Sequence, residues 1–162
     1  MKTLFLQKGI GEGTAGLITA MVGELANNAF DHNLGKWRDI RGCWLETAMN
    51  NDQLTIYVAD RGQGVTASLS RVRPGIDDLE AIRIAFAEHV TGRAPEKRGN
   101  GLKFVMNVLH DFEDIEFSYY SGNAWLHYSS KADRESDIKN LVSKAPVIIR
   151  GVYANITIKR FL

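Results

Sequence analysis

The stretch MVGELANNAFDHNL, Met21 to Leu34, decides how this chain folds. Read as a helix, it places Glu24, Asn28 and His32 four residues apart, so their side chains stack on one face, one turn above the next. An apolar stripe runs beside them and consists of Met21, Val22, Leu25, Ala26 and Ala29. The helix can therefore pack on a sheet along one edge and present a carboxylate, an amide and an imidazole along the adjacent edge.

Asn27, Asn28 and Asn33 are unusual in such a helix, because an asparagine side chain competes with the backbone for hydrogen bonds. Three of them next to a buried apolar face lower the stability of the helix, which indicates a functional site. From this segment alone an ordinary surface helix is the favoured interpretation. The other segments of the chain change that balance.

The composition is that of one soluble globular domain, and a single domain over residues 1–162 is expected. The net charge of +1 argues against a nucleic-acid partner held by charge. Cys43 is the only cysteine, which excludes a disulfide framework and a cysteine metal cluster. No apolar run approaches the ~18 residues of a membrane span. Met1 to Leu6 is too short for a signal peptide, so a cytoplasmic protein is expected.

Apolar periodicity and turn residues predict the remaining elements. The chain begins with a strand or extended arm over Lys2–Gln7, followed by the long helix to about His32, which Gly35 ends, and a hairpin of Cys43–Met49 and Leu54–Ala59. Two helices follow, one over Asp78–Val90 capped by Asp77 or Asp78 and one over Lys103–Leu109, and then a hairpin of Ile115–Tyr120 and Trp125–Ser129. The last elements are a helix over Ala132–Ser143 and one long or two short strands over Val147–Leu162, with a break near Gly151. Strands joined by hairpins predict a mixed or antiparallel sheet with helices on one face, a two-layer α/β sandwich.

Three glycine clusters are candidates for a nucleotide site. The first, Gly11, Gly13 and Gly16, spells the dinucleotide fingerprint GxGxxG. The apolar run before it is very short, and no acidic residue ends a following apolar strand until Asp60, so a flexible start to the helix is the better interpretation. No GxxxxGK[ST] occurs, which excludes a P-loop.

The second cluster is DRGQGV, Asp60 to Val65, directly after an apolar strand. An aspartate there accepts hydrogen bonds only, and it can take one from the exocyclic amine of adenine. A simple Asx turn explains the cluster as well. The third is RGNGL, Arg98 to Leu102, which opens a helix. Backbone N–H groups at a helix start bind phosphate, and Lys103 adds positive charge, although an ordinary loop before a helix is equally consistent.

Taken together and in this order, three segments resemble the GHKL-superfamily ATP-binding domain, the histidine kinase-like ATPase domain of gyrase-type topoisomerases, heat-shock chaperones, sensor histidine kinases and mismatch-repair ATPases. ELANNAFDH resembles the N box, E-x-x-x-N-A-x-x-H. DRGQG resembles the first glycine box, D-x-G-x-G, and RGNGL the second, G-x-G-L. The resemblance covers most of the chain. It implies the Bergerat-type α+β fold, a mixed β-sheet covered on one face by helices, with residues 65–99 as a lid over ATP.

The resemblance also implies a role for each matching residue. Asn28 matches the residue that binds Mg²⁺, and Asp60 matches the residue that accepts a hydrogen bond from adenine. Glu24 matches the carboxylate that polarises a water or an acceptor hydroxyl. The remaining implied ATP contacts are Gly62 and Gly64 beside the base, Gly99, Gly101, Leu102 and Lys103 at the phosphate end of the lid, Thr91, Gly92 and Arg93 within the lid, and His32 and Lys36 beyond the N box. One position departs from the pattern: Gly151 is followed by Val152 where the family often has threonine, and Thr157 lies further on and is free to face elsewhere.

This resemblance implies ATP-dependent phosphoryl transfer to a partner protein, or ATP hydrolysis, in bacterial-type signalling, with Glu24 as base. An alternative is a non-catalytic module whose lid is ordered by ATP and then binds a partner protein. A third reading is a structural interaction domain with degenerate glycine loops. No segment before the long helix resembles the phosphorylated hairpin of a sensor histidine kinase, so the phosphate acceptor is expected on another chain or a missing part of this one.

Overall fold

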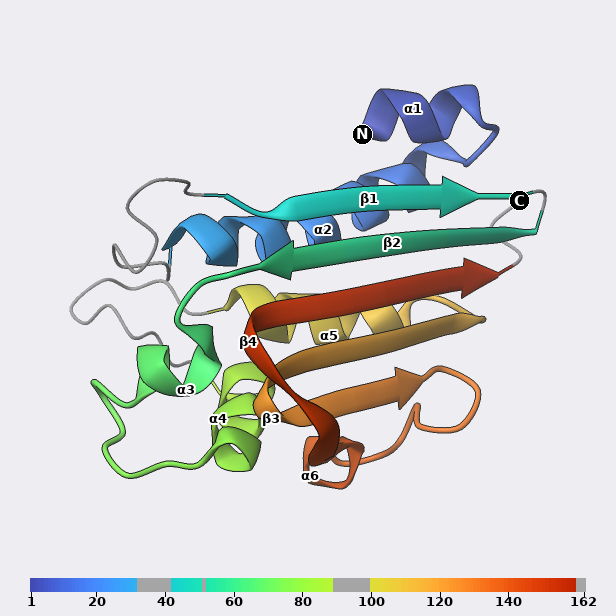
Figure 1. The fold of residues 1–162 in the computed structure, drawn as a ribbon. Helices are drawn as coiled ribbons and strands as arrows, with labels where there is room; N and C mark the ends of the chain where they lie inside the picture. Colours follow the sequence, from blue (N-terminus) through green and yellow to red (C-terminus); the bar gives the residue numbers. More distant parts are fainter. Residues whose placement is uncertain (32–41, 51, 89–99, 160–162) are drawn as a thin grey trace.

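The structure, a computed structural model, describes residues 1–31, 42–50, 52–88 and 100–159. Within them a four-stranded sheet packs against helices in two layers (Figure 1). The strands are β1 (Trp44–Met49), β2 (Gln53–Asp60), β3 (Ile115–Ser129) and β4 (Val142–Lys159), in the spatial order β1-β2-β4-β3. Neighbouring strands in this order are all antiparallel, so the antiparallel alternative was right and the mixed sheet implied by the family is not what these residues form.

The long helix is α2 (Glu12–Asp31), and it packs against β2 and against α5 (Gly101–His110). Its buried apolar side chains recur about every three or four residues, as expected for a helix with one face on a core. They are Ala15, Ile18, Met21, Val22, Leu25 and Ala29. None of the described helices is long and apolar enough to cross a membrane.

The first element is a helix, α1 (Lys2–Gln7), and the predicted strand or extended arm over these residues was wrong. A six-residue apolar run fits either period, so its tertiary contacts decide the structure. Phe5 is buried at 1% exposure, and α1 packs on α2. Gly9, with φ at +86°, then reverses the chain into α2, a conformation that glycine adopts without strain.

Both predicted hairpins are present. β1 and β2 pair from Trp44 with Ala59 to Met49 with Leu54. The second hairpin lies within β3, which doubles back at Gly122 (Figure 1). Across this hairpin the rings of Tyr120 and Trp125 stack at 5.3 Å. The Ser130 N–H also donates to the Ile115 carbonyl at 3.0 Å, so the two halves of β3 lie side by side.

β4 combines the two forms predicted for the end of the chain. It is one element that bends at Gly151, and its parts on either side pair with different halves of β3. The predicted helix over Ala132–Ser143 was wrong except for α6 (Ile138–Leu141). The Asp133 carboxylate accepts from the Ser129 N–H and favours a turn, and the Asp137 carboxylate caps α6 by accepting from the Lys139 N–H, so the helix begins only at Ile138.

Much of the segment predicted as a lid belongs to the core. It contains α3 (Gly64–Leu69) and α4 (Asp78–Ala87), and Asp77 caps α4 by accepting from the Glu80 N–H at 2.8 Å. Phe86 of α4 is 2% exposed and meets the ring of Tyr119 edge-on at 4.9 Å. Residues 89–99 of the predicted lid lie outside the described residues.

Candidate functional site

Three parts of the chain that carry the sequence motifs end on the same side of the molecule. The last turns of α2, the end of β2 at Asp60 and the start of α5 at Gly101 lie together at the left of Figure 1. Since α2 packs against both β2 and α5, the three elements are neighbours in space as well as in this view. The arrangement expected from the motif order is therefore compatible with the fold.

Glu24 and Asn28 occupy successive turns of α2, and both are partly buried. The Glu24 carboxylate lies against the start of α5, because a Cβ built on Gly101 would come within 2.5 Å of Glu24 Oε2. The side-chain amide of Asn28 has a nitrogen that is buried and lacks a hydrogen-bond partner in the described part of the chain. A buried amide left unsatisfied costs stability, which is typical of a group that binds a ligand.

Asp60 is held at the end of β2 by backbone donors. The Gly62 N–H donates to Asp60 Oδ1 at 2.6 Å, and the Val152 N–H also donates to the carboxylate. Burial raises the pKa of Asp60, and these two N–H groups oppose part of that rise. The site therefore holds a desolvated carboxylate in a fixed orientation, ready to accept a hydrogen bond from a ligand.

The carboxylate of Asp60 raises the pKa of two neighbouring groups. Burial raises the pKa of the Cys43 thiol, and the Asp60 carboxylate raises it further. Tyr119 behaves in the same way: burial raises the pKa of its hydroxyl, and Asp60 adds to the effect. Both groups therefore stay neutral at physiological pH.

Two glycines allow the backbone to close around Asp60. Gly151 has φ at +86°, and a Cβ on it would come within 2.3 Å of the Asp60 carbonyl oxygen. Gly64 has φ at +79°, and a Cβ there would lie 2.9 Å from Ser121 Oγ. Ser121 Oγ accepts from the Val65 N–H and donates to the Gly151 carbonyl, at 3.0 Å in each case.

The third motif forms the first turn of α5. Asn100 is its N-cap residue and makes no side-chain capping bond within the described residues. Gly101, Leu102 and Lys103 follow, and all three are partly buried, with Leu102 packed on the core. The backbone N–H groups at this helix start have no partners within the helix and suit an anion such as phosphate.

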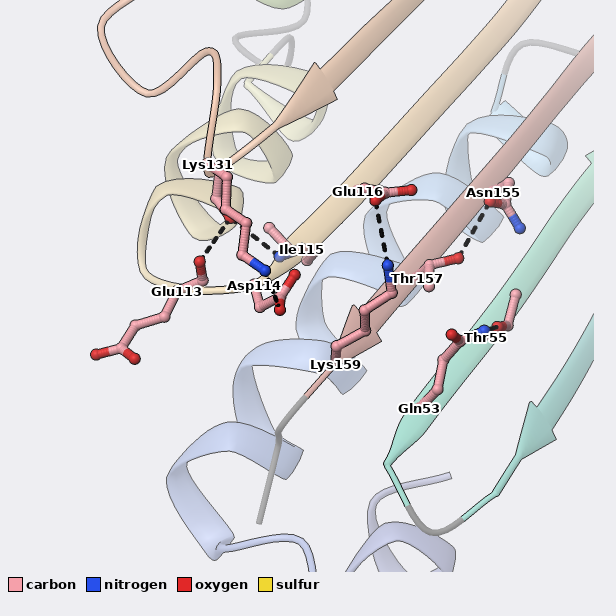
Figure 2. Close-up of polar contacts among 11 residues, drawn as sticks. Gln53, Thr55, Glu113, Asp114, Ile115, Glu116, Lys131, Asn155, Thr157 and Lys159 are labelled. Carbon is pink, nitrogen blue, oxygen red and sulfur yellow. Dashed lines mark hydrogen bonds and ion pairs between the residues drawn. The ribbon is translucent and has the colours of Figure 1, made fainter.

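Other residues singled out from the sequence lie elsewhere. Thr157 alternates along β4 with the buried Ile156 and Ile158, so it is on the face of the sheet away from the helices. It lies beside Asn155 there (Figure 2), and it pairs with Thr55 in β2, whereas Asp60 at the end of that strand pairs with Val152. Six predicted ATP contacts lie outside the described residues: His32, Lys36, Thr91, Gly92, Arg93 and Gly99.

Sequence reasoning missed Ser121, and it did not predict that Gly151 and Val152 would contact Asp60. Gly151 was noted as a break in the last strand and, with Val152, as a departure from the family pattern, and Ser121 fell between the two strands of the predicted second hairpin. The break was the usable signal, since an isolated glycine in a strand often marks a close approach of another backbone. No sequence pattern indicated that Ser121 would lie across the sheet from Val152.

The residues present fit Mg²⁺ only as a weakly ligated ion. No group of three histidine, cysteine, aspartate or glutamate side chains in the described ranges could hold a metal. The amide oxygen of Asn28 is of the ligand type that Mg²⁺ takes, and Mg²⁺ commonly has one or two protein ligands, with phosphates and water completing its shell. The atom of Asn28 that lacks a partner is the nitrogen, a donor that suits an acceptor such as a phosphate oxygen. A magnesium ion that arrives with a nucleotide is thus compatible with these residues.

Comparisons with known proteins give a limited result. No family model and no curated protein sequence matches the chain. Among solved structures, it is similar to the B subunit of the DNA gyrase from Myxococcus xanthus, with 11% sequence identity and a TM-score of 0.38. The match covers 90% of this chain and 38% of that subunit, so the chain spans well under half of its length. A likeness at this level establishes neither family nor activity.

Proposed function

We propose that this domain binds ATP with Mg²⁺ where α2, β2 and α5 converge, for phosphoryl transfer to a partner protein or for hydrolysis. The observation that supports this most is that Glu24 of α2 lies against Gly101 of α5, while α2 also packs against β2, the strand that ends at Asp60. One end of the site offers a buried acceptor for a base, and another offers a helix start for phosphate. ATP carries complementary groups in one molecule.

The adenine is assigned to the Asp60 end. A carboxylate accepts hydrogen bonds only, so it suits the 6-amino group of adenine and opposes the carbonyl oxygen of guanine. Burial strengthens this preference, because a buried acceptor left without a donor costs free energy. We assign Gly62 to a position beside the base, whereas the space next to Gly64 is taken by Ser121, whose Oγ would lie 2.9 Å from a Cβ on that glycine.

The phosphates are assigned to the start of α5. Its free N–H groups and helix dipole attract an anion, and Lys103 in the first turn adds positive charge. Asn28, one turn beyond Glu24, would hold Mg²⁺ together with the phosphates, and the ion would neutralise their charge. Glu24 lies against Gly101 and is thus next to the proposed phosphate position, where it can act as general base for a water or a hydroxyl.

Isothermal titration calorimetry with ATP and Mg²⁺ tests the proposal. The unaltered chain is expected to bind, and Asn28→Ala and Asp60→Ala are each expected to weaken binding by about tenfold or more. Asn155→Ala and Asp52→Ala are matched controls, because they remove the same groups on the open face of the sheet and in the β1–β2 turn. An unaltered chain that binds no ATP would exclude the proposed function.

A further inference from the structure

A buried serine connects the two backbone segments that border Asp60. Ser121 is 2% exposed and lies on β3 across from Val152, which itself lies across from Asp60. Its hydroxyl accepts from the Val65 N–H and donates to the Gly151 carbonyl, both at 3.0 Å. A serine hydroxyl has a single proton to donate, and here the protein uses it. Ser121 is therefore engaged with the backbone rather than free to contact a ligand.

The segments that Ser121 holds are those that orient the Asp60 carboxylate. Gly62, whose N–H donates to Asp60 Oδ1 at 2.6 Å, lies three residues before Val65. Val152, whose N–H is the other donor to this carboxylate, directly follows Gly151. One hydroxyl thus fixes the backbone on both sides of the acceptor.

The backbone segments that contain Gly64 and Gly151 pack closely against Ser121 and Asp60. A Cβ on Gly64 would lie 2.9 Å from Ser121 Oγ, and a Cβ on Gly151 would lie 2.9 Å from Asp60 Oδ1. A side chain at either glycine would therefore collide with Ser121 or Asp60, so both backbone segments approach these two residues closely. Loss of the hydroxyl would release both segments and, with them, the orientation of the carboxylate.

We infer that Ser121 is a positioning residue that sets the base selectivity of the nucleotide site, an inference that rests on the proposed function. The 6-amino group of adenine donates to the carboxylate, whereas a purine without this group leaves the buried acceptor unpaired. Such a site discriminates strongly only while the acceptor is held in place. Ser121 provides that constraint from β3 through its hydrogen bonds to Val65 and Gly151.

The test compares two ligands on two proteins. Dissociation constants are measured by calorimetry for ATP and for purine riboside 5′-triphosphate, which lacks only the 6-amino group. We expect the unaltered chain to prefer ATP by at least about tenfold, and Ser121→Ala to lose most of that preference. The ratio of the two constants is the readout, since general weakening of binding leaves it unchanged.

Ser130→Ala is a closely matched control. Ser130 is 5% exposed, and its hydroxyl accepts from the Ile115 N–H at 3.0 Å and donates to the Glu113 carbonyl at 2.9 Å. Figure 2 shows Glu113 and Ile115 at this contact, at the end of the sheet away from Asp60. Both variants lose the same pair of hydrogen bonds from a buried serine. Similar drops in unfolding temperature are expected, with a changed ratio only in Ser121→Ala.

The outcomes separate this inference from the proposed function. A chain that binds neither nucleotide overturns the proposed function, and the inference with it. A chain that prefers ATP while Ser121→Ala keeps that preference overturns the inference alone, as does an equal loss in Ser130→Ala. If Ser121→Ala does not fold, Ser121→Cys retains the volume with a weaker donor, and an unchanged ratio there overturns the inference.

Discussion

The carboxylate of Glu24 occupies the space that a side chain at position 101 would need. A Cβ on Gly101 would lie 2.5 Å from Glu24 Oε2 and 3.5 Å from its carboxyl carbon. Position 101 is therefore glycine for reasons of space, since it begins a helix and its φ is not positive. An anionic side chain next to a helix start also interacts favourably with the helix dipole.

Gly101→Ala is expected to weaken ATP binding without a loss of stability. The new methyl group displaces the flexible end of Glu24, while alanine favours a helix over glycine by up to about 1 kcal/mol. The methyl also obstructs the approach of phosphate to the backbone, so we expect a roughly tenfold weaker dissociation constant. Gly23→Ala is the control, because a Cβ there meets no atom within 4 Å. Equal ATP affinity in both variants would contradict the phosphate assignment.

Glu24→Gln separates catalysis from binding. The substitution keeps the shape of the side chain and removes the base, so ATP turnover should fall by about 10²–10⁴-fold while ATP still binds. Phosphate release and calorimetry measure the two properties, with Glu12→Gln at the exposed start of the same helix as control. Undiminished turnover would refute the base assignment. ATP-dependent partner binding that persists in Glu24→Gln, without turnover in the unaltered chain, would favour the non-catalytic module.

The sequence was sufficient for elements whose own period and turns determine them. The long helix and both hairpins were predicted because apolar spacing and turn residues agree there. Lys2–Gln7 was misassigned because six residues do not separate a helical from a strand period, and burial of Phe5 against α2 decides the structure. The prediction of a helix over Ala132–Ser143 failed because Asp133 bonds to the Ser129 N–H in a turn and Asp137 caps a helix that begins only at Ile138.

At the candidate site, the local motifs could be identified from the sequence, but the contacts between residues on different strands could not. Glu24, Asp60 and Gly101 each belong to a recognisable pattern of neighbours in sequence. Ser121 reaches the site only through the register of β3 on β4, which no local pattern encodes. The positions of His32 and the lid residues around Arg93 remain predictions, since they lie outside the described residues.

Asp78→Ala is expected to destabilise the fold by about 1–3 kcal/mol. One carboxylate oxygen of Asp78 accepts from the Thr66 hydroxyl, and the other accepts from the Asn123 N–H at 2.9 Å, so this side chain joins α3, α4 and the β3 turn. Asp77→Ala removes only a helix cap and should cost about 1 kcal/mol. Denaturant unfolding with unchanged slope measures both values. A smaller loss in Asp78→Ala than in Asp77→Ala would show that this junction contributes little.

The stability of the chain should depend on pH through Asp60. Its pKa is raised above the ordinary 3.8 by burial, so the folded state holds this proton more tightly than the unfolded state does. The resulting stabilisation is fully present below the unfolded value and is lost as the pH rises through the folded pKa. Relative to Asp60→Asn, the unaltered chain should gain free energy of unfolding as the pH falls from neutral. A constant difference between the two proteins across this range would contradict the raised pKa.

ATP affinity should follow the opposite trend, because the 6-amino group of adenine needs the ionised carboxylate. As the pH falls through the raised pKa of Asp60, protonation removes the acceptor and ATP binding weakens. Calorimetry from neutral pH to about pH 4.5 measures this change. Asp60→Asn serves as reference, since the ionisation of the ATP phosphates contributes equally to both proteins. Parallel pH profiles would mean that Asp60 does not titrate with binding. Either acid leaves the carboxylate of Asp60 ionised in the free protein, or the base binds elsewhere. In the second case the adenine assignment fails.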